Sequence, residues 1–196
     1  PAMMYPCRDM EQLCYKEMLA DNTVKKMPRK EDMVLDAANI CRLGKDWVYL
    51  ESDSGNTKAY EWLCEQYPTI NIEKVNFYAG VHIDSTIVPL REGLAICNKP
   101  RVKTKRYLPP CMKDWEIIWV DDVTAQVFYQ YPYASKWIGL NMLSINKDTV
   151  IMDTAQTELS NTLEKKGFTV IPHTLRHSRT LGGGHHCVTL DTWRED

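Results

Sequence analysis

The chain has 196 residues and a formal net charge of −2, and its residues are 44% hydrophobic and 26% charged. A chain of this length can form one sizeable hydrophobic core or two small ones, and this composition excludes an intrinsically disordered protein. The small net charge gives no long-range attraction to nucleic acid or to an anionic membrane. The basic run at residues 99–106 is interpreted as a solvated loop, because no aromatic stacking pattern or nucleic-acid-binding motif accompanies it.

The seven cysteines are odd in number and contain no Cys-x-x-Cys pair. A disulfide framework is therefore not expected, and a reducing compartment, by default the cytoplasm, is predicted. No apolar segment reaches the roughly 18 residues that a membrane-spanning helix needs, and the first residues lack the apolar core of a signal peptide. The chain begins with Pro1, which fits either removal of an initiator methionine or a piece of a longer protein.

Hydrophobic periodicity predicts alternating strands and helices along the chain. A short helix is expected at 9–19, strands at 33–35 and 46–50 around a turn at Gly44, a helix at 57–67 and a strand at 70–77. Further strands are expected at 94–97, 117–120, 138–143 and 149–152. The last helix carries Ala155, Leu159 and Leu163 four residues apart, starts at a cap on Asp153 or Thr154, and ends at Gly167 before a strand at 168–171.

A repeated unit follows from this order: a strand pair, then a helix, then another strand. It occurs at 33–77 and again at 138–171, with a less regular region between them. The pattern predicts an α/β fold made of similar modules rather than one doubly wound sheet. Because no glycine-rich phosphate loop follows a strand, nucleotide chemistry is not expected.

The principal candidate for chemistry is Cys187, near the end of the chain. Three glycines at 182–184 and two histidines precede it, and the apolar, β-prone residues 188–190 follow. Consecutive glycines let the backbone approach a ligand closely, so we interpret the segment as a tight loop that delivers the cysteine to a strand edge. The alternative is a plain turn before a small buried cysteine, but each glycine costs about 0.5–1 kcal/mol relative to alanine. Function is therefore the favoured interpretation.

A nucleophilic thiol needs a proton-transfer partner, and a His-x-Asp sequence, His82 and Asp84, lies about a hundred residues upstream. If 81–85 is extended, the two side chains point to the same face. Histidine can transfer protons near neutral pH, and a carboxylate can accept two parallel N–H bonds from a guanidinium. The alternative is an ordinary polar strand end.

A zinc site is the competing interpretation, because four histidines and Cys187 lie within fifteen positions at 173–187. Their spacing matches no common zinc finger, and a Cys-x-x-Cys arm is missing. We therefore predict no metal and no cofactor.

Several short motifs occur in the order, and at nearly the spacing, of a known enzyme family: 35–39 with 42–46, 82–86, 98–101, 135–137 with Asn141, and 181–187. On these motifs, over roughly residues 30–191, the chain resembles the amidinotransferase family, within the pentein superfamily of guanidine-modifying enzymes. The resemblance implies an α/β fold that is a partial pentein propeller, with about three of five ββαβ-type modules. It also implies a single, incomplete catalytic domain over residues 1–196, because family members are about twice this length and the chain resembles their C-terminal half or more.

The same resemblance implies the chemistry of three residues. Cys187 would attack the guanidinium carbon of L-arginine and carry the amidino group as a covalent intermediate. His82 would protonate the departing amine and then deprotonate the incoming acceptor, a primary amine such as glycine. Asp36 would partner His82 and fix its orientation.

Substrate contacts are implied for three further residues. Asp84 matches the guanidinium-binding carboxylate, and Arg101 and Ser135 match positions that hold the substrate carboxylate. The implied partners are thus arginine and an amine, with no nucleic acid and no membrane. The oligomeric state is left open, with a homodimer among the options.

The chain departs from the family pattern at three places. Asn39 stands where a second aspartate is common, residues 78–81 replace an Asn- and Pro-containing approach to His82, and His185 replaces a bulky apolar residue. Family members also supply a further guanidinium-binding carboxylate from upstream of the part that matches. Two alternatives therefore remain: a guanidine hydrolase of the arginine deiminase or dihydrolase type, and an inactive guanidine-binding module.

Overall fold

The computed structural model describes residues 15, 17–20, 24–28, 32–124, 135–175, 177 and 182–191. The chain divides into two compact units, one made of Pro1–Ile83 with Leu190–Asp196 and the other of Asp84–Thr189. Most of the helix expected at 9–19 lies outside the described residues. Within the described part of the chain, no helix is both long and apolar enough to cross a membrane.

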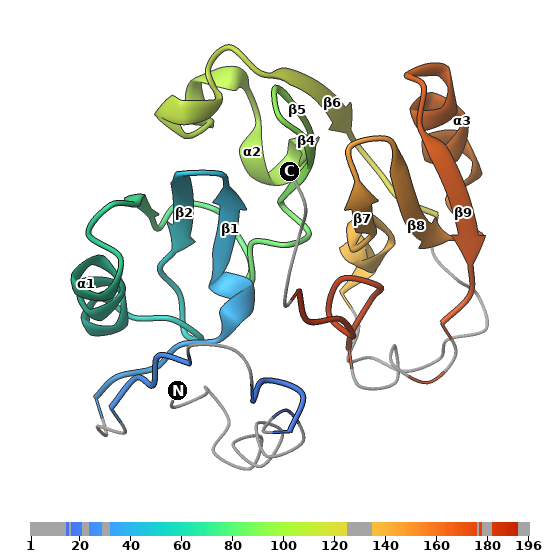
Figure 1. Ribbon diagram of the computed structural model, residues 1–196. Helices are drawn as coiled ribbons and strands as arrows, with labels where there is room; N and C mark the ends of the chain where they lie inside the picture. Colours follow the sequence, from blue (N-terminus) through green and yellow to red (C-terminus); the bar gives the residue numbers. More distant parts are fainter. Residues whose placement is uncertain are drawn as a thin grey trace. The chain divides into compact units, whose positions relative to one another are not determined.

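The first unit contains one three-stranded sheet in the order β1-β2-β3 (Figure 1). β1 and β2 are antiparallel, and β2 and β3 are parallel. Gly44, at a φ of 69°, supplies the left-handed conformation that the tight turn between β1 and β2 requires. The elements are β1 (Ile40–Leu43), β2 (Asp46–Leu50), α1 (Thr57–Gln66) and β3 (Asn71–Val75), with a 3₁₀ turn at Ala37–Asn39 before β1.

Helix α1 covers the core of this unit. Asn56 caps its start, and the Asn56 side chain accepts a hydrogen bond from the Ala59 N–H at 3.1 Å. Ala59 and Leu63 lie on its buried face, and they pack in one hydrophobic cluster with Tyr49 and Ile72. Burial of a side chain such as Leu63 contributes about 1.5–3 kcal/mol, which holds the helix against the sheet.

The strand expected at 33–35 is wrong. Of these residues only Leu35 pairs, in an isolated bridge with Gly55, and the strand that pairs with β2 is β1. Gly44 and Lys45 form a two-residue turn, which pairs the residues on either side of it, Leu43 and Asp46. Residues 33–35 instead lead into the 3₁₀ turn.

The second unit contains two further three-stranded sheets, in the orders β4-β5-β6 and β7-β8-β9 (Figure 1). Each repeats the scheme of the first sheet, an antiparallel pair followed by a parallel strand. The less regular region of the sequence is therefore a third module, and the prediction of about three modules is confirmed. The elements are β4 (Ile87–Arg91), β5 (Leu94–Asn98), α2 (Lys99–Val102), β6 (Glu116–Val120), β7 (Leu143–Asn146), β8 (Thr149–Asp153), α3 (Thr157–Lys165) and β9 (Thr169–His173).

A 3₁₀ helix at Lys136–Leu140 replaces the first half of the strand expected at 138–143. Trp137 and Leu140, three residues apart, are both buried, which is the spacing of a helical turn rather than of a strand. The expected end of α3 is confirmed, since Gly167 has a φ of 86°. Its expected start is wrong, because the helix begins at Thr157 after Gln156 and not after a cap at Asp153 or Thr154. One hydrophobic cluster in this unit joins residues of both sheets and α3, including Ile96, Leu140, Met152 and Leu163.

Candidate active site

The first unit pairs Asp36 with His82. Asp36 immediately precedes the 3₁₀ turn, and its backbone carbonyl accepts a hydrogen bond from the Asn39 N–H at 3.0 Å. Nε2 of His82 lies 3.2 Å from Oδ2 of Asp36, and the two side chains are 29% and 6% exposed. A buried carboxylate thus holds a partly exposed imidazole, fixes its orientation, and can balance the charge that the ring gains with a proton.

The backbone on both sides of His82 is anchored as well. The Ile83 N–H donates a hydrogen bond to the Ala38 carbonyl at 2.9 Å. The Val81 carbonyl oxygen lies within hydrogen-bonding distance of three side-chain atoms: Asn39 Nδ2 at 3.2 Å, Ser52 Oγ at 2.7 Å and Ser54 Oγ at 2.8 Å. The turn that carries Asp36 therefore also fixes the segment that carries His82.

Asn39, which the sequence marks only as a departure from the family, is the centre of this anchor. It is fully buried, donates from Nδ2 to the Leu50 carbonyl at 2.7 Å, and accepts at Oδ1 from the Ser54 hydroxyl at 2.8 Å. A Cβ on Gly55 would lie 2.8 Å from Cγ of Asn39, so glycine is required there for the amide to fit. An amide suits this position because it both donates and accepts, which a carboxylate cannot do.

The expectation that residues 81–85 are extended is wrong. They form bends and turns, so strand alternation says nothing about the direction of the His82 and Asp84 side chains. The physical reason is that the polar backbone groups of Val81 and Ile83 are bound by the 3₁₀ turn and nearby side chains instead of by a neighbouring strand.

The second unit places Cys187 in a turn rather than at a strand edge. Residues 185–188 form this turn, and Val188 and Leu190 are 53% and 52% exposed, so the expected strand over 188–190 is wrong. Gly182 takes a φ of 84°, as the glycine-rich loop predicts. Gly184 is needed for a different reason, because a Cβ there would lie 2.6 Å from both Cβ and Oδ1 of Asn141.

One carboxylate oxygen of Asp84 lies close to several polar groups in and beside this turn. Oδ2 of Asp84 lies 2.8 Å from Nδ2 of Asn141, 3.2 Å from Nδ1 of His186 and 3.4 Å from Sγ of Cys187. The structure therefore brings together two of the predicted residues, Asp84 and Cys187. A guanidinium bound by this carboxylate would lie next to a thiol.

Asn141 is the residue whose role the sequence missed. It is 2% exposed, and its Oδ1 accepts a hydrogen bond from the Cys187 N–H at 3.1 Å while its backbone carbonyl accepts one from the His185 N–H at 2.9 Å. It thus contacts both Asp84 and the turn that carries Cys187. The available signal was a buried amide in the otherwise apolar stretch 137–143.

The surroundings of Cys187 favour the neutral thiol. Although Cys187 is exposed as a residue, desolvation of its sulfur raises the pKa of the thiol to about 12, and the Asp84 carboxylate contributes in the same direction. Hydrogen bonds from the Gly184 backbone and the Asn141 side chain lower this pKa, but to a lesser extent than burial raises it. The thiol beside the Asp84 carboxylate is therefore a poor nucleophile until something stabilises its thiolate.

Arg101 binds the two residues that follow Asp84. Its Nη1 donates to Oγ1 of Thr86 at 2.9 Å and to Oγ of Ser85 at 3.1 Å. Burial lowers the pKa of Arg101, whereas the negative charge of Asp84 raises it. The guanidinium remains charged, since arginine is not deprotonated in proteins, and a substrate carboxylate could bind to it.

Ser135 performs a local structural task. It is exposed, and its Oγ accepts a hydrogen bond from the Trp137 N–H at 3.2 Å at the start of the 3₁₀ helix. Its predicted contact with a substrate carboxylate is not tested by this geometry and stays a prediction.

Two of the four histidines at 173–187 contact each other. Nδ1 of His173 lies 3.3 Å from Nε2 of the buried His185, with the rings packed edge to face. Across the described ranges, no group of three histidine, cysteine, aspartate or glutamate side chains could hold a metal ion.

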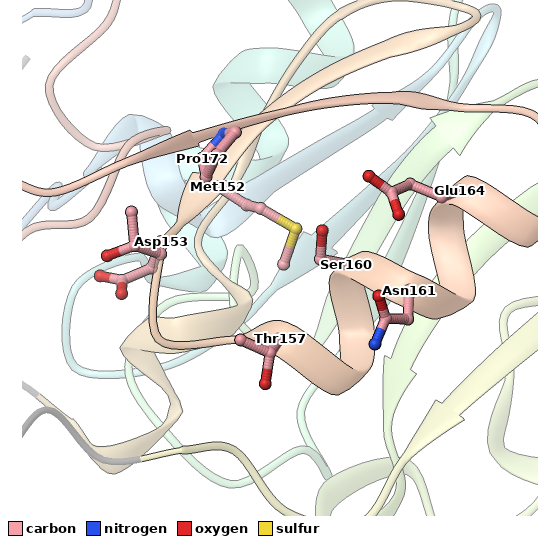
Figure 2. Close-up of a pocket in the computed structure, with 8 residues that line it drawn as sticks. Met152, Asp153, Thr157, Ser160, Asn161, Glu164 and Pro172 are labelled. Atoms are coloured by element: carbon pink, nitrogen blue, oxygen red, sulfur yellow. The ribbon is translucent and has the colours of Figure 1, made fainter.

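A separate hollow lies between α3 and the end of β8 (Figure 2). It has a volume of about 220 Å³, and Figure 2 shows Met152 extending toward α3, beside Ser160. Its lining residues are Met152, Asp153, Thr154, Thr157, Ser160, Asn161, Glu164 and Pro172. None of the predicted site residues lines it, so it is distinct from the Asp84 and Cys187 cluster.

Sequence comparison finds amidinotransferases. Inosamine-phosphate amidinotransferase 1 from Streptomyces griseus is 44% identical over 169 residues, which cover 84% of this chain and 48% of that protein. Mitochondrial glycine amidinotransferase from Xenopus laevis is 29% identical over 171 residues, which cover 81% of this chain and 38% of that protein. The chain thus spans about half the length of the curated relatives that it matches, or less. No protein-family model matches it.

The solved structures that resemble this chain also include amidinotransferases. The inosamine-phosphate amidinotransferase from Streptomyces griseus matches with a TM-score of 0.89 and 36% identity over 99% of this chain and 63% of that one. An amidinotransferase from Microseira wollei matches with a TM-score of 0.87 and 25% identity over 99% and 65%. DDAH from Pseudomonas aeruginosa, with a TM-score of 0.69 and 16% identity over 93% and 66%, shares the fold alone. Over most of its own length, the chain is therefore similar to the amidinotransferases and shares their pentein fold.

Proposed function

We propose that this chain carries the catalytic cysteine of an amidinotransferase, which moves an amidino group from a guanidino donor of the arginine type to an amine. The observation that carries the proposal is the 3.4 Å contact between Sγ of Cys187 and Oδ2 of Asp84. A carboxylate that can bind a guanidinium there lies directly beside a thiol that can attack it.

In the first half-reaction, the Cys187 thiolate forms a bond to the guanidinium carbon, and the bond from that carbon to the side-chain nitrogen of the donor breaks. The departing amine takes a proton from His82. In the second half-reaction, the acceptor amine attacks the same carbon and gives a proton back to His82, and the thiolate leaves. Asp36 holds the imidazole during both transfers, at 3.2 Å in the free protein. Only Ile83 separates His82 from Asp84 in the sequence, which supports a joint role.

Substrate binding would itself prepare the nucleophile. Burial and the Asp84 charge raise the pKa of Cys187 to about 12 in the free protein. A guanidinium bound to Asp84 neutralises that charge and places a cation beside the sulfur, and both effects lower the pKa of the thiol. The thiolate then forms where its target is already bound. Arg101 and Ser135 would hold the carboxylate of the donor, as the family resemblance implies.

The identity of the acceptor amine is a more specific part of the proposal. The family resemblance pointed to a primary amine such as glycine, and one relative carries the name glycine amidinotransferase. The more similar relative is named for inosamine phosphate, at 44% identity against 29%. We therefore place an amino-cyclitol phosphate beside glycine as the acceptors to compare.

The decisive experiment is acid-quenched mass spectrometry of the 196-residue chain after brief incubation with L-arginine, with Cys187→Ala as the matched control. A gain of one amidino group on Cys187 supports the proposal, and its transfer to glycine or to inosamine phosphate identifies the acceptor. Citrulline formation without an acceptor would instead favour a guanidine hydrolase. If no adduct forms and arginine binds unchanged, the inactive guanidine-binding alternative applies to this chain.

A further inference from the structure

The buried side chain of Asn141 is the feature of the second unit that the proposed chemistry does not use. Asn141 makes three hydrogen bonds. Its Nδ2 donates to Asp84 at 2.8 Å, its Oδ1 accepts from the Cys187 N–H at 3.1 Å, and its backbone carbonyl accepts from the His185 N–H at 2.9 Å. A carboxylate only accepts and a backbone N–H only donates, so the orientation of the amide is fixed by its partners.

The glycine loop is built around this amide. A Cβ on Gly184 would lie 2.6 Å from Cβ and Oδ1 of Asn141, closer than real side chains approach. The loop can therefore press its backbone against Asn141 only because residue 184 is glycine. This packing sets the Cys187 N–H at hydrogen-bonding distance from the amide oxygen.

We propose that Asn141 is a positioning residue whose neutral amide links the Asp84 carboxylate to the Cys187 turn without adding a second negative charge beside the thiol. The inference rests on the proposed function, because it takes Cys187 as the nucleophile. Asn141 does not touch the reacting atoms in this assignment. It binds Oδ2 of Asp84, the oxygen that also faces the sulfur at 3.4 Å, and thereby fixes which oxygen meets the thiol.

An amide is required in this arrangement because it donates to one partner and accepts from the other without adding charge. Aspartate at 141 has the same size and keeps the acceptor for the Cys187 N–H, but it replaces the donor to Asp84 with a second carboxylate. Two carboxylates at this distance repel each other, and the added charge disfavours the nearby thiolate. Alanine removes both hydrogen bonds but adds no charge.

The test compares the rate at which iodoacetamide alkylates Cys187 between pH 7.5 and 10 in the full chain, followed on the peptide that contains this cysteine. We expect Asn141→Asp to slow alkylation about tenfold at a given pH, the effect of one unit of thiol pKa, and Asn141→Ala to change it less. Asn161→Asp, on the exposed face of α3, is the matched control and should match wild type.

A purely structural role predicts the opposite order, since the alanine variant loses more contacts than the isosteric aspartate. The inference is overturned if Asn141→Asp alkylates at the wild-type rate or faster, or if Asn141→Ala shows the larger loss. Thermal melting of each variant identifies one that fails to fold. In that case Asn141→Gln, which keeps an uncharged amide, is used in its place. Its alkylation rate should be closer to the wild-type rate than that of Asn141→Ala. The alkylation assay needs no arginine, so it tests this inference independently of catalysis. Failure of the proposed function is seen in the other experiment, as absence of the amidino adduct on wild-type Cys187.

Discussion

Replacement of Asp84 by asparagine should make Cys187 more reactive while it weakens the binding of arginine. Oδ2 of Asp84 lies 3.4 Å from the sulfur, and its charge adds to the burial that raises the pKa of Cys187 to about 12. At this separation two unit charges interact by about 1 kcal/mol in water and about 5 kcal/mol at an effective dielectric constant near 20. Since Cys187 lies in an exposed turn, we adopt about 1–2 kcal/mol, which is about one pKa unit.

The assay is the rate of iodoacetamide alkylation at pH 8, read on the Cys187 peptide, together with calorimetry of L-arginine binding. Asp84→Asn should react about tenfold faster than wild type, because the thiolate fraction rises tenfold for each unit that the pKa falls. Asp121→Asn removes an exposed carboxylate that pairs with Lys99 and should leave both measurements unchanged. If Asp84→Asn reacts no faster than wild type, the carboxylate does not suppress the thiolate and the reasoning fails.

Three further predictions concern other parts of the chain. Asp36→Asn should slow formation of the amidino adduct less than His82→Ala, which should slow it by about 10²–10⁴-fold in rapid-quench kinetics; equal adduct rates in wild type and His82→Ala would refute the acid–base role. Gly55→Ala should reduce the free energy of unfolding by about 1–3 kcal/mol in urea titration, because its Cβ would lie 2.8 Å from Asn39, and an unchanged midpoint would contradict the packing. Cys97 is fully buried and its pKa is raised to about 12, so stability should be intact below pH 9 and decline as pH rises from about 9 to 12, where only the unfolded thiol ionises. Cys97→Ser should flatten that decline, and an equal slope in both proteins would show that another group causes it.

Local sequence signals predicted most of the fold. Strands β2, β5, β6 and β8 and helices α1 and α3 follow from hydrophobic periodicity, and positive-φ glycines at 44 and 167 mark a turn and a helix end. The errors at 33–35 and 138–143 have different causes. The turn at Gly44 pairs β2 with β1 rather than with residues 33–35. The short apolar run that begins at 138 fits a strand or a helical turn equally well, and burial against the rest of the unit decides between them.

Residue types predicted the chemistry of the candidate site, but only packing revealed its geometry. Cys187 after three glycines, and Asp36, His82 and Asp84 within family motifs, can be identified from the printed sequence alone. Asn141 was recognised only as part of a motif, because an amide has no distinctive chemistry of its own. Its function depends on partners that lie 57 and 46 positions away in the chain.

The sequence by itself thus determined the modular α/β pattern and the presence of a thiol, an imidazole and carboxylates suited to guanidine chemistry. Tertiary structure decided that Oδ2 of Asp84 meets Cys187 and Asn141, and that the pKa of this thiol is raised. The physical reason is that hydrogen bonds and desolvation depend on which distant segments pack together, whereas periodicity and residue type are local properties.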